Sequence, residues 1–148
     1  MKIGDVIRPE HVIVGLRAND KAQLLQELAR RAATTLALDQ RLILDALQAR
    51  ENLGSTGLGK GFALPHARLA VLTSPFALFV RLARPIDFAA IDERPVDLVI
   101  LLLPPESAGN QHLATLAALS RPLRDGEFVQ RVRQAPDAAA LHKLLADA

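Results

Sequence analysis

The chain contains no cysteine, tryptophan or tyrosine, and its 148 residues include only five phenylalanines. Without cysteine there is no disulfide framework, no thiolate nucleophile and no zinc site of the cysteine type. The scarcity of aromatic rings leaves little from which to build stacking platforms for single-stranded nucleic acid. These absences exclude thiol chemistry and argue against nucleic acid as a partner.

The chain also has no strong excess of charge of one sign. The 18 Lys and Arg residues are scattered among 16 Asp and Glu residues, and the formal net charge is +2. Such a pattern carries no electrostatic footprint for nucleic acid. The four histidines are dispersed without metal-ligand spacing, so we expect no metal site and no cofactor.

No long apolar run is present. The longest, residues 98–103, is far too short to cross a bilayer, and the first five residues do not begin a signal peptide. The length fits one compact domain. We therefore expect a single domain over residues 1–148, a cytoplasmic location and no membrane insertion.

Four aspartates suit the N-cap position of predicted helices. Asp20 precedes a helix that ends near residue 37, and Asp39 precedes one that runs to about residue 53. Asp125 and Asp137 precede two short final helices. A further helix is predicted from about residues 108–111 through 119, where Pro122 ends or kinks it. The predicted buried residues of the second helix are Leu42, Ile43, Ala46 and Leu47.

Strands are predicted where apolar and β-branched residues run between turn signals, at residues 11–16, 62–67, 77–82 and 96–103. The last run is nearly all apolar, which predicts a central strand covered on both faces. Because helices and strands alternate irregularly, the pattern favours an α/β fold with helices on both faces of a sheet.

Residues 54–61 hold four of the eight glycines and are predicted to form an irregular loop. They come within one position of a nucleotide-binding P-loop, because Gly54, Gly59 and Lys60 fit but Gly61 replaces the hydroxyl residue that ligates magnesium. The context is inverted as well, since a helix leads into a strand. A nucleotide-binding regulator and a plain flexible connector are the alternatives for this stretch.

Three short sequence motifs occur in order in and around this stretch. They are Arg50-Glu51, Gly54-Ser55-Thr56-Gly57-Leu58-Gly59 and Ala63-Leu64-Pro65-His66. Together they resemble the phosphorylation segment of the fructose–mannitol class of enzyme IIA domains of the bacterial phosphotransferase system, most of all the nitrogen-regulatory type. Similarity continues through residues 84–88, residues 95–98 and the His112-Leu113 pair. The resemblance therefore spans essentially the whole chain.

This resemblance implies a type-2 EIIA domain with a mixed sheet of about five strands sandwiched between helices. It places the phosphoryl group on His66, with Arg50 and His112 as the other catalytic residues. Ser55, Thr56 and Gly57 would support the phosphate loop. The implied donor is the histidine-phosphocarrier protein, and the implied acceptors are regulatory target proteins or a IIB component.

The chemistry suits these residue types. An imidazole with an ordinary pKa of about 6.5 is a neutral nucleophile near pH 7. Arg50 offers phosphate a planar, permanently charged fork, and His112 lies near a predicted helix N-terminus, where an anion is favoured. Each residue also has a structural alternative. These are a hydrogen-bonded histidine at a strand end for His66, a cation on helix carbonyls for Arg50 and a helix-start residue for His112.

Two functions stay open. In the first, phosphorylation of His66 controls which regulatory targets the protein binds, because a phosphoryl group adds about two negative charges. In the second, His66 relays phosphate to a IIB component during uptake of a fructose-like sugar. The residues of the glycine stretch resemble the nitrogen-regulatory type, and no IIB or membrane segment is fused to the domain. Both observations favour regulation. His11 and His142 have no supporting motif and are predicted to be structural or surface residues.

Overall fold

The computed structural model describes residues 2–148, apart from the side chain of residue 108, so residue 1 of the predicted domain lies outside it. Five strands form one sheet in the order β1-β4-β5-β3-β2. The β1–β4 and β3–β5 pairs are parallel, and the β4–β5 and β2–β3 pairs are antiparallel. The sheet is therefore mixed, as predicted. The strands are β1 (Val12–Leu16), β2 (Gly57–Gly59), β3 (Phe62–Ala63), β4 (Phe76–Ile86) and β5 (Val96–Leu103).

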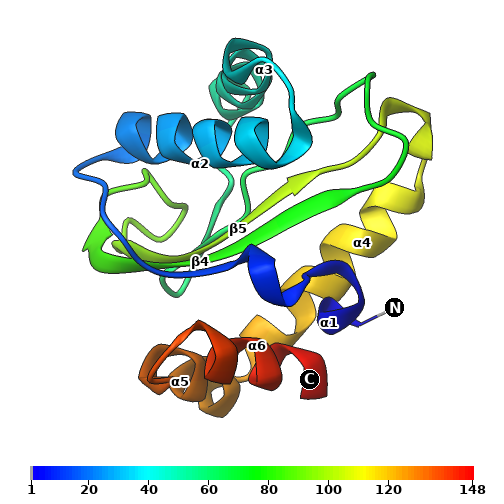
Figure 1. The fold of residues 1–148 in the computed structure, drawn as a ribbon. Helices are drawn as coiled ribbons and strands as arrows, with labels where there is room; N and C mark the ends of the chain where they lie inside the picture. The colour runs from blue at the N-terminus through cyan, green and yellow to red at the C-terminus, as the bar shows by residue number, and fades with distance from the viewer. Residues whose placement is uncertain (1) are drawn as a thin grey trace.

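Helices cover both faces of this sheet, as Figure 1 shows. Helices α2 (Lys21–Leu36) and α3 (Gln40–Asn52) lie on one face. The opposite face is covered by α1 (Ile3–Val6), α4 (Gln111–Ser120), α5 (Gly126–Gln134) and α6 (Ala138–Asp147). Short 3₁₀ turns at Pro9–His11, Glu106–Ala108 and Arg121–Arg124 complete the chain. The α/β class expected from the sequence is confirmed.

The predicted helix starts are confirmed by their caps. The carboxylates of Asp20 and Asp137 accept backbone N–H bonds from the third helical residue, while those of Asp39 and Asp125 accept from the second. The helix after Asp20 ends at Ala37, which is left-handed with φ of 56°. Pro122 lies in the 3₁₀ turn that follows α4, so the α-helix ends where it was expected to end.

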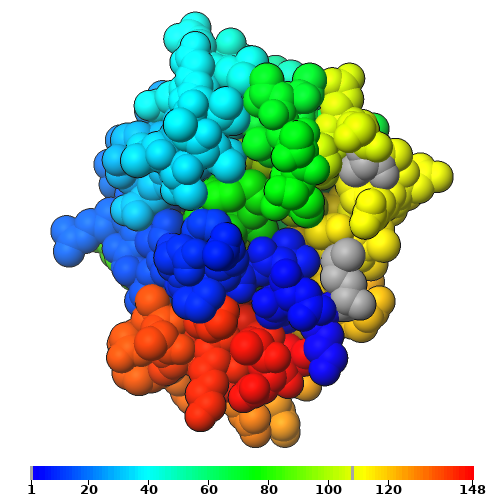
Figure 2. All heavy atoms as spheres, turned by 45° about the vertical axis from the view of Figure 1, so that its right-hand side comes forward, coloured from blue at the N-terminus to red at the C-terminus, as the bar shows by residue number. Residues whose placement is uncertain are grey.

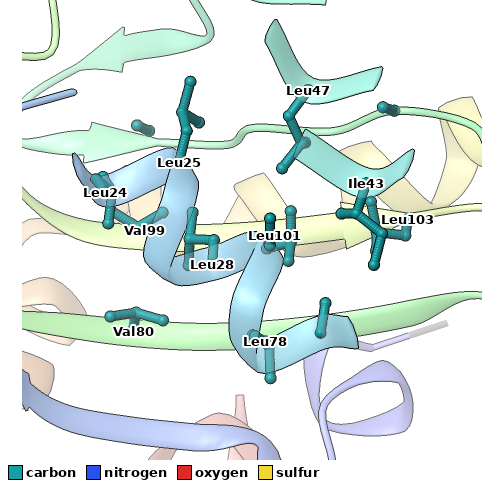
Figure 3. Packing of buried hydrophobic residues seen from close by; sticks show 14 of the residues in the cluster. Leu24, Leu25, Leu28, Ile43, Leu47, Leu78, Val80, Val99, Leu101 and Leu103 are labelled. Atoms are coloured by element: carbon teal, nitrogen blue, oxygen red, sulfur yellow. The ribbon is translucent and has the colours of Figure 1, made fainter. Parts of the chain in front are cut away.

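Two apolar layers stabilise the sandwich, one on each face of the sheet. In the layer shown in Figure 3, Leu24, Leu28 and Ile43 from α2 and α3 pack on Val99 and Leu101 of β5. The opposite layer holds Phe79, Ile100 and Leu102 under the terminal helices. From Leu98 to Leu103, successive residues of β5 thus enter alternate layers, and every residue of the strand except Asp97 is buried. The prediction of a central strand covered on both faces is confirmed.

The two ends of the chain meet on the second face. In Figure 2 the dark blue N-terminal segment lies directly beside the red C-terminal helix. A Cβ on Gly4 of α1 would come within 2.7 Å of Ala146 Cα in α6, so the two helices touch through backbone. This contact helps to close the helical layer on the second face of the sheet.

Several local predictions were wrong. Residues 57–59 form strand β2 rather than loop, because pairing with β3 orders a segment whose glycine content disfavours strands. Leu42 is 45% exposed, since it lies one position off the Ile43–Leu47 stripe that α3 buries. Strand β4 continues beyond residue 82 to Ile86, and His11 belongs to a 3₁₀ turn.

Candidate functional site

The segment after β3 carries the candidate nucleophile along the edge of the central strand. Residues 64–69 stay extended, with parallel bridges from His66 to Leu102 and from Leu69 to Pro105. The backbone N–H of Ala67 donates to Leu102 O at 3.2 Å, and Pro65 O accepts from Leu102 N at 3.0 Å. Because side chains alternate in extended backbone, Ala67 enters the core layer under α2 and α3, whereas His66 points to the opposite side.

The imidazole of His66 is half-buried and has one fixed hydrogen bond. Its Nδ1 lies 2.8 Å from Leu64 O. A carbonyl oxygen can only accept, so Nδ1 carries the proton and the lone pair is on Nε2. Burial lowers the pKa of His66 below its ordinary value, the hydrogen bond to Leu64 O partly opposes this shift, and the positive charge of Arg50 lowers the pKa further. The ring is therefore a neutral base near pH 7.

A hollow of about 200 Å³ opens beside this ring. It lies between the end of α3, the glycine stretch and α4, and it brings four of the predicted site residues together. Arg50, Ser55, Thr56 and His66 line it with Leu58, Leu64, Leu116, Ala117 and Ser120. A small anionic group can enter it from the surface.

Arg50 lies in the last turn of α3 and donates from Nη1 to Gly54 O at 2.8 Å. The acceptor is a carbonyl just beyond the helix, so the structural alternative for Arg50 describes one of its contacts. A guanidinium has five N–H donors, and this bond uses one. The others leave Arg50 able to bind an anion in the hollow it shares with His66.

Glu51 holds the loop in place, a role that sequence reasoning missed. Its side chain is only 5% exposed and forms an ion pair with Lys21 of α2, with Nζ 2.8 Å from Oε2. It also accepts hydrogen bonds from the backbone N–H and the hydroxyl of Thr56, which is buried. Lys21 in turn lies 4.5 Å from the centre of the Phe88 ring. The one available signal was a carboxylate directly after Arg50.

The hydroxyls of the loop make internal hydrogen bonds. Ser55 Oγ donates to Phe88 O at 3.3 Å and accepts from Gly57 N at 3.0 Å. The Thr56 hydroxyl donates to Glu51. In this arrangement neither hydroxyl proton points to an anion, and their part in binding phosphate stays a prediction.

Gly57 does not line the hollow, but it allows the loop to lie close to residues 88–91. A Cβ at this position would come within 2.8 Å of both Ala90 Cα and Ala90 Cβ. We expect Gly57→Ala to lower the free energy of unfolding by about 1–3 kcal/mol, because backbone must move to relieve the clash. Urea unfolding measures this change. A variant as stable as the wild type would contradict the close approach.

His112, like Gly57, does not line this hollow. It lies in the first turn of α4 and lines a separate hollow with Pro104 and Thr115. Its Nδ1 lies 2.6 Å from Gly109 O and 2.9 Å from Arg68 Nη2, and its Nε2 lies 3.2 Å from the same Nη2. Arg68 Nη2 also donates to Gly109 O. Arg68 therefore orients His112, a contact that the sequence did not predict.

The glycine stretch differs from a P-loop in its geometry. It forms the antiparallel β2–β3 pair, and the connecting Lys60 and Gly61 have φ of 57° and 81°. Strand β3 follows, where a P-loop requires a helix N-terminus. The Lys60 backbone N–H donates to Asp92 at 2.8 Å. This arrangement fits a β-hairpin and not a phosphate cradle for nucleotides.

The other two histidines lie outside the site. His142 Nε2 is 3.1 Å from Ile7 O, and the His11 ring lies 4.9 Å from that of Phe76. Among residues 2–148, no group of three or more His, Asp or Glu side chains is arranged to hold a metal ion. Within the same residues, no helix has both the length and the apolar character needed to span a bilayer.

Comparison with known proteins decides the family. Residues 5–148 match the family described as "Phosphoenolpyruvate-dependent sugar phosphotransferase system, EIIA 2". The chain belongs to this family. The resemblance first drawn from residues 50–68 is thereby confirmed, and the chain is, at the level of its family, a phosphotransferase component.

The individual relatives are named either as nitrogen regulatory proteins or as sugar-specific EIIA components. The nitrogen regulatory protein of Bradyrhizobium diazoefficiens is 46% identical over 146 residues, covering 99% of this chain and 95% of that protein. The crystal structure of nitrogen regulatory protein IIA-Ntr from Neisseria meningitidis has a TM-score of 0.90 at 31% identity, covering 97% and 98% of the two chains. A fructose-specific EIIA component of Haloferax volcanii is 36% identical over 109 residues, covering 74% and 71%.

Proposed function

We propose that this chain, as one EIIA domain, carries a phosphoryl group on Nε2 of His66 and receives it from a histidine-phosphocarrier protein. The observation that carries the proposal is the half-buried, neutral ring with its Nδ1 proton bound to Leu64 O, beside a hollow that Arg50 also lines. The Nδ1 bond leaves Nε2 as the nitrogen with a lone pair. A nucleophile of this kind needs no metal and no separate base.

The transfer step is a simple exchange of one P–N bond for another. The Nε2 lone pair attacks the phosphorus of the donor phosphohistidine, and the donor nitrogen leaves with the electrons of the broken bond. A protein catalyses phosphoryl transfer mainly by positioning the reactants and stabilising charge. Arg50 supplies positive charge for the equatorial oxygens, and Leu64 O stabilises the Nδ1–H of the ring, which becomes cationic on phosphorylation.

Phosphorylation can be tested with purified components. The chain is incubated with phosphoenolpyruvate, enzyme I and the histidine-phosphocarrier protein, and its intact mass is then measured. We expect one added phosphoryl group that is lost in acid, as phosphohistidine would be. No mass gain, or a phosphoryl group that survives acid, would count against His66 as the acceptor.

The rate of phosphorylation should depend on pH in a defined direction. Burial places the pKa of His66 below about 6.5, so most of the rings are still neutral and nucleophilic at that pH. The rate with the small donor phosphoramidate, corrected for the donor's own titration, should fall with a midpoint below about pH 6.5. For the same reason the folded state loses stability relative to the unfolded state below about pH 6.5. A rate midpoint above 6.5 would contradict the lowered pKa.

Arg50→Ala should slow acceptance by roughly 100-fold, because it removes a preorganised charged donor from the hollow. It should leave most of the stability, since the lost Gly54 contact lies at a solvent-accessible helix end. Arg50→Lys keeps the charge without the planar fork and should give an intermediate rate. Single-turnover phosphorylation followed by intact mass measures all three proteins. If Arg50→Ala were phosphorylated as fast as the wild type, Arg50 would have no part in the transfer.

Between the two functions open to an EIIA protein, we propose regulation, with a cytoplasmic location. The support is sequence identity: a nitrogen regulatory relative is 46% identical over 99% of the chain, whereas fructose-specific relatives are 36% identical over 74% of it and 28% identical over 95% of it. The phosphoryl group places about two negative charges in the hollow, offset in part by the cationic ring, and such a change can select between partners. The alternative, relay to a IIB component, predicts rapid loss of the phosphoryl group when a IIB protein is added, whereas regulation predicts target binding that differs between the two states.

A further inference from the structure

The hollow beside His66 is one end of a longer groove. A second hollow of about 420 Å³ adjoins it, since Leu58 and Ser120 line both. The groove runs between the β2–β3 hairpin and the α4 helix with its following 3₁₀ turn. We call it the hairpin groove. The residues of its far half are Leu58, Gly59, Lys60, Phe62, Ser120, Leu123 and Arg124.

Positive charge lies at both ends of the hairpin groove. Arg50 lies at the His66 end, and Lys60 and Arg124 lie at the far end. No aspartate or glutamate lines either half. Among the ion pairs of residues 2–148, none involves these three cations. The nearby Asp92 instead accepts the Lys60 backbone N–H and pairs with Arg94.

The surface between these charges is apolar. Phe62 and Leu123 are buried below it, and Leu58 is half exposed at the junction of the two hollows. An apolar centre with a charged rim is the usual composition of a protein–protein contact. Rim charges contribute chiefly to association rate and partner choice, which suits a weak and transient exchange.

Resting on the proposed role of His66, we infer that the hairpin groove docks the phosphorylated donor protein through an acidic face of that protein. The donor must bring its phosphohistidine to the His66 end. The contact surface that extends from there meets Lys60 and Arg124, with no carboxylate in the groove to repel a partner. The complementary face therefore combines apolar side chains with Asp or Glu residues placed to meet these two cations. A basic or neutral face would leave both cations unpaired in the complex.

The test compares two groove variants with a matched control. Lys60→Gln and Arg124→Glu remove or reverse a groove charge. Arg17→Glu changes an exposed arginine next to β1, at the opposite edge of the sheet from the hairpin. The probe is the phosphorylated histidine-phosphocarrier protein of the organism that encodes this chain. Each rate is divided by the rate with phosphoramidate, which needs no docking, and thermal unfolding checks that each variant is folded.

We expect the KM for the phosphocarrier to rise about 5- to 10-fold in each groove variant at low ionic strength, with kcat little changed and with Arg17→Glu like the wild type. Added salt should raise the wild-type KM and narrow the difference, since the screening length falls to about 8 Å at 0.15 M. Groove variants that match the wild type would overturn the docking inference alone. A wild-type chain that accepts phosphate from neither donor would overturn the role of His66 as well. If Arg124→Glu does not fold, Lys60→Gln decides the question.

Discussion

His66→Ala should abolish phosphorylation, with the rate falling by at least about 1000-fold to the level of the background reaction. The variant removes the lone pair that forms the new P–N bond, and no other ring nitrogen lines the hollow with Arg50. Time courses with phosphoenolpyruvate, enzyme I and the phosphocarrier, read by intact mass, measure the effect. The fold should persist, because His66 is half-buried at a strand edge rather than within either core layer.

His11→Ala is the matched control for this loss. That ring packs on Phe76, away from the groove, and its removal should leave the phosphorylation rate unchanged. A His66→Ala protein that still gains an acid-labile phosphoryl group would assign the acceptor to another histidine. Loss of phosphorylation in both variants would point to damage to the fold and not to the chemistry.

Glu51→Ala should cause the largest loss of stability, about 2–3 kcal/mol in the free energy of unfolding. The change leaves the buried backbone N–H and hydroxyl of Thr56 without their acceptor and deprives Lys21 of its ion pair. The value lies below the ~3–5 kcal/mol typical of breaking a buried pair, because Lys21 is 26% exposed and regains water. Urea unfolding followed by far-ultraviolet circular dichroism measures it.

Two comparisons sharpen that measurement. Glu51→Gln keeps an oxygen acceptor for Thr56 and should lose less, about 1 kcal/mol. Glu27→Ala removes the exposed pairs with Arg30 and Arg31 and should cost less than about 1 kcal/mol. If Glu51→Ala were no more destabilising than Glu27→Ala, Glu51 would not hold the loop as the structure indicates.

The local rules of the sequence predicted most of the helices and the central strand. Asp20, Asp39, Asp125 and Asp137 each mark a helix start because an N-cap carboxylate acts within a few residues of itself. The apolar run of β5 predicted burial on both faces for an equally local reason. Strand β2 was missed because its order depends on pairing with β3 and on the approach of residues 88–91.

The candidate site likewise has a part that the sequence predicted and a part that it did not. The motif predicted that Arg50, Ser55, Thr56 and His66 belong together, and they line one hollow. The contact of Lys21 with Glu51 joins residues thirty positions apart, and that of Arg68 with His112 joins residues 44 positions apart. Such contacts are created by tertiary packing of α2, α3 and α4. Neither the periodicity nor the motifs of this sequence predict these contacts.

The most direct test of the central claim is the position of the phosphoryl group on the imidazole ring. Nitrogen–phosphorus coupling in a ¹⁵N-labelled, phosphorylated sample identifies the nitrogen bonded to phosphorus. With the Nδ1 proton held by Leu64 O, we predict phosphate on Nε2 of His66. Phosphate on Nδ1 of His66, or on any other histidine, would contradict the proposed site.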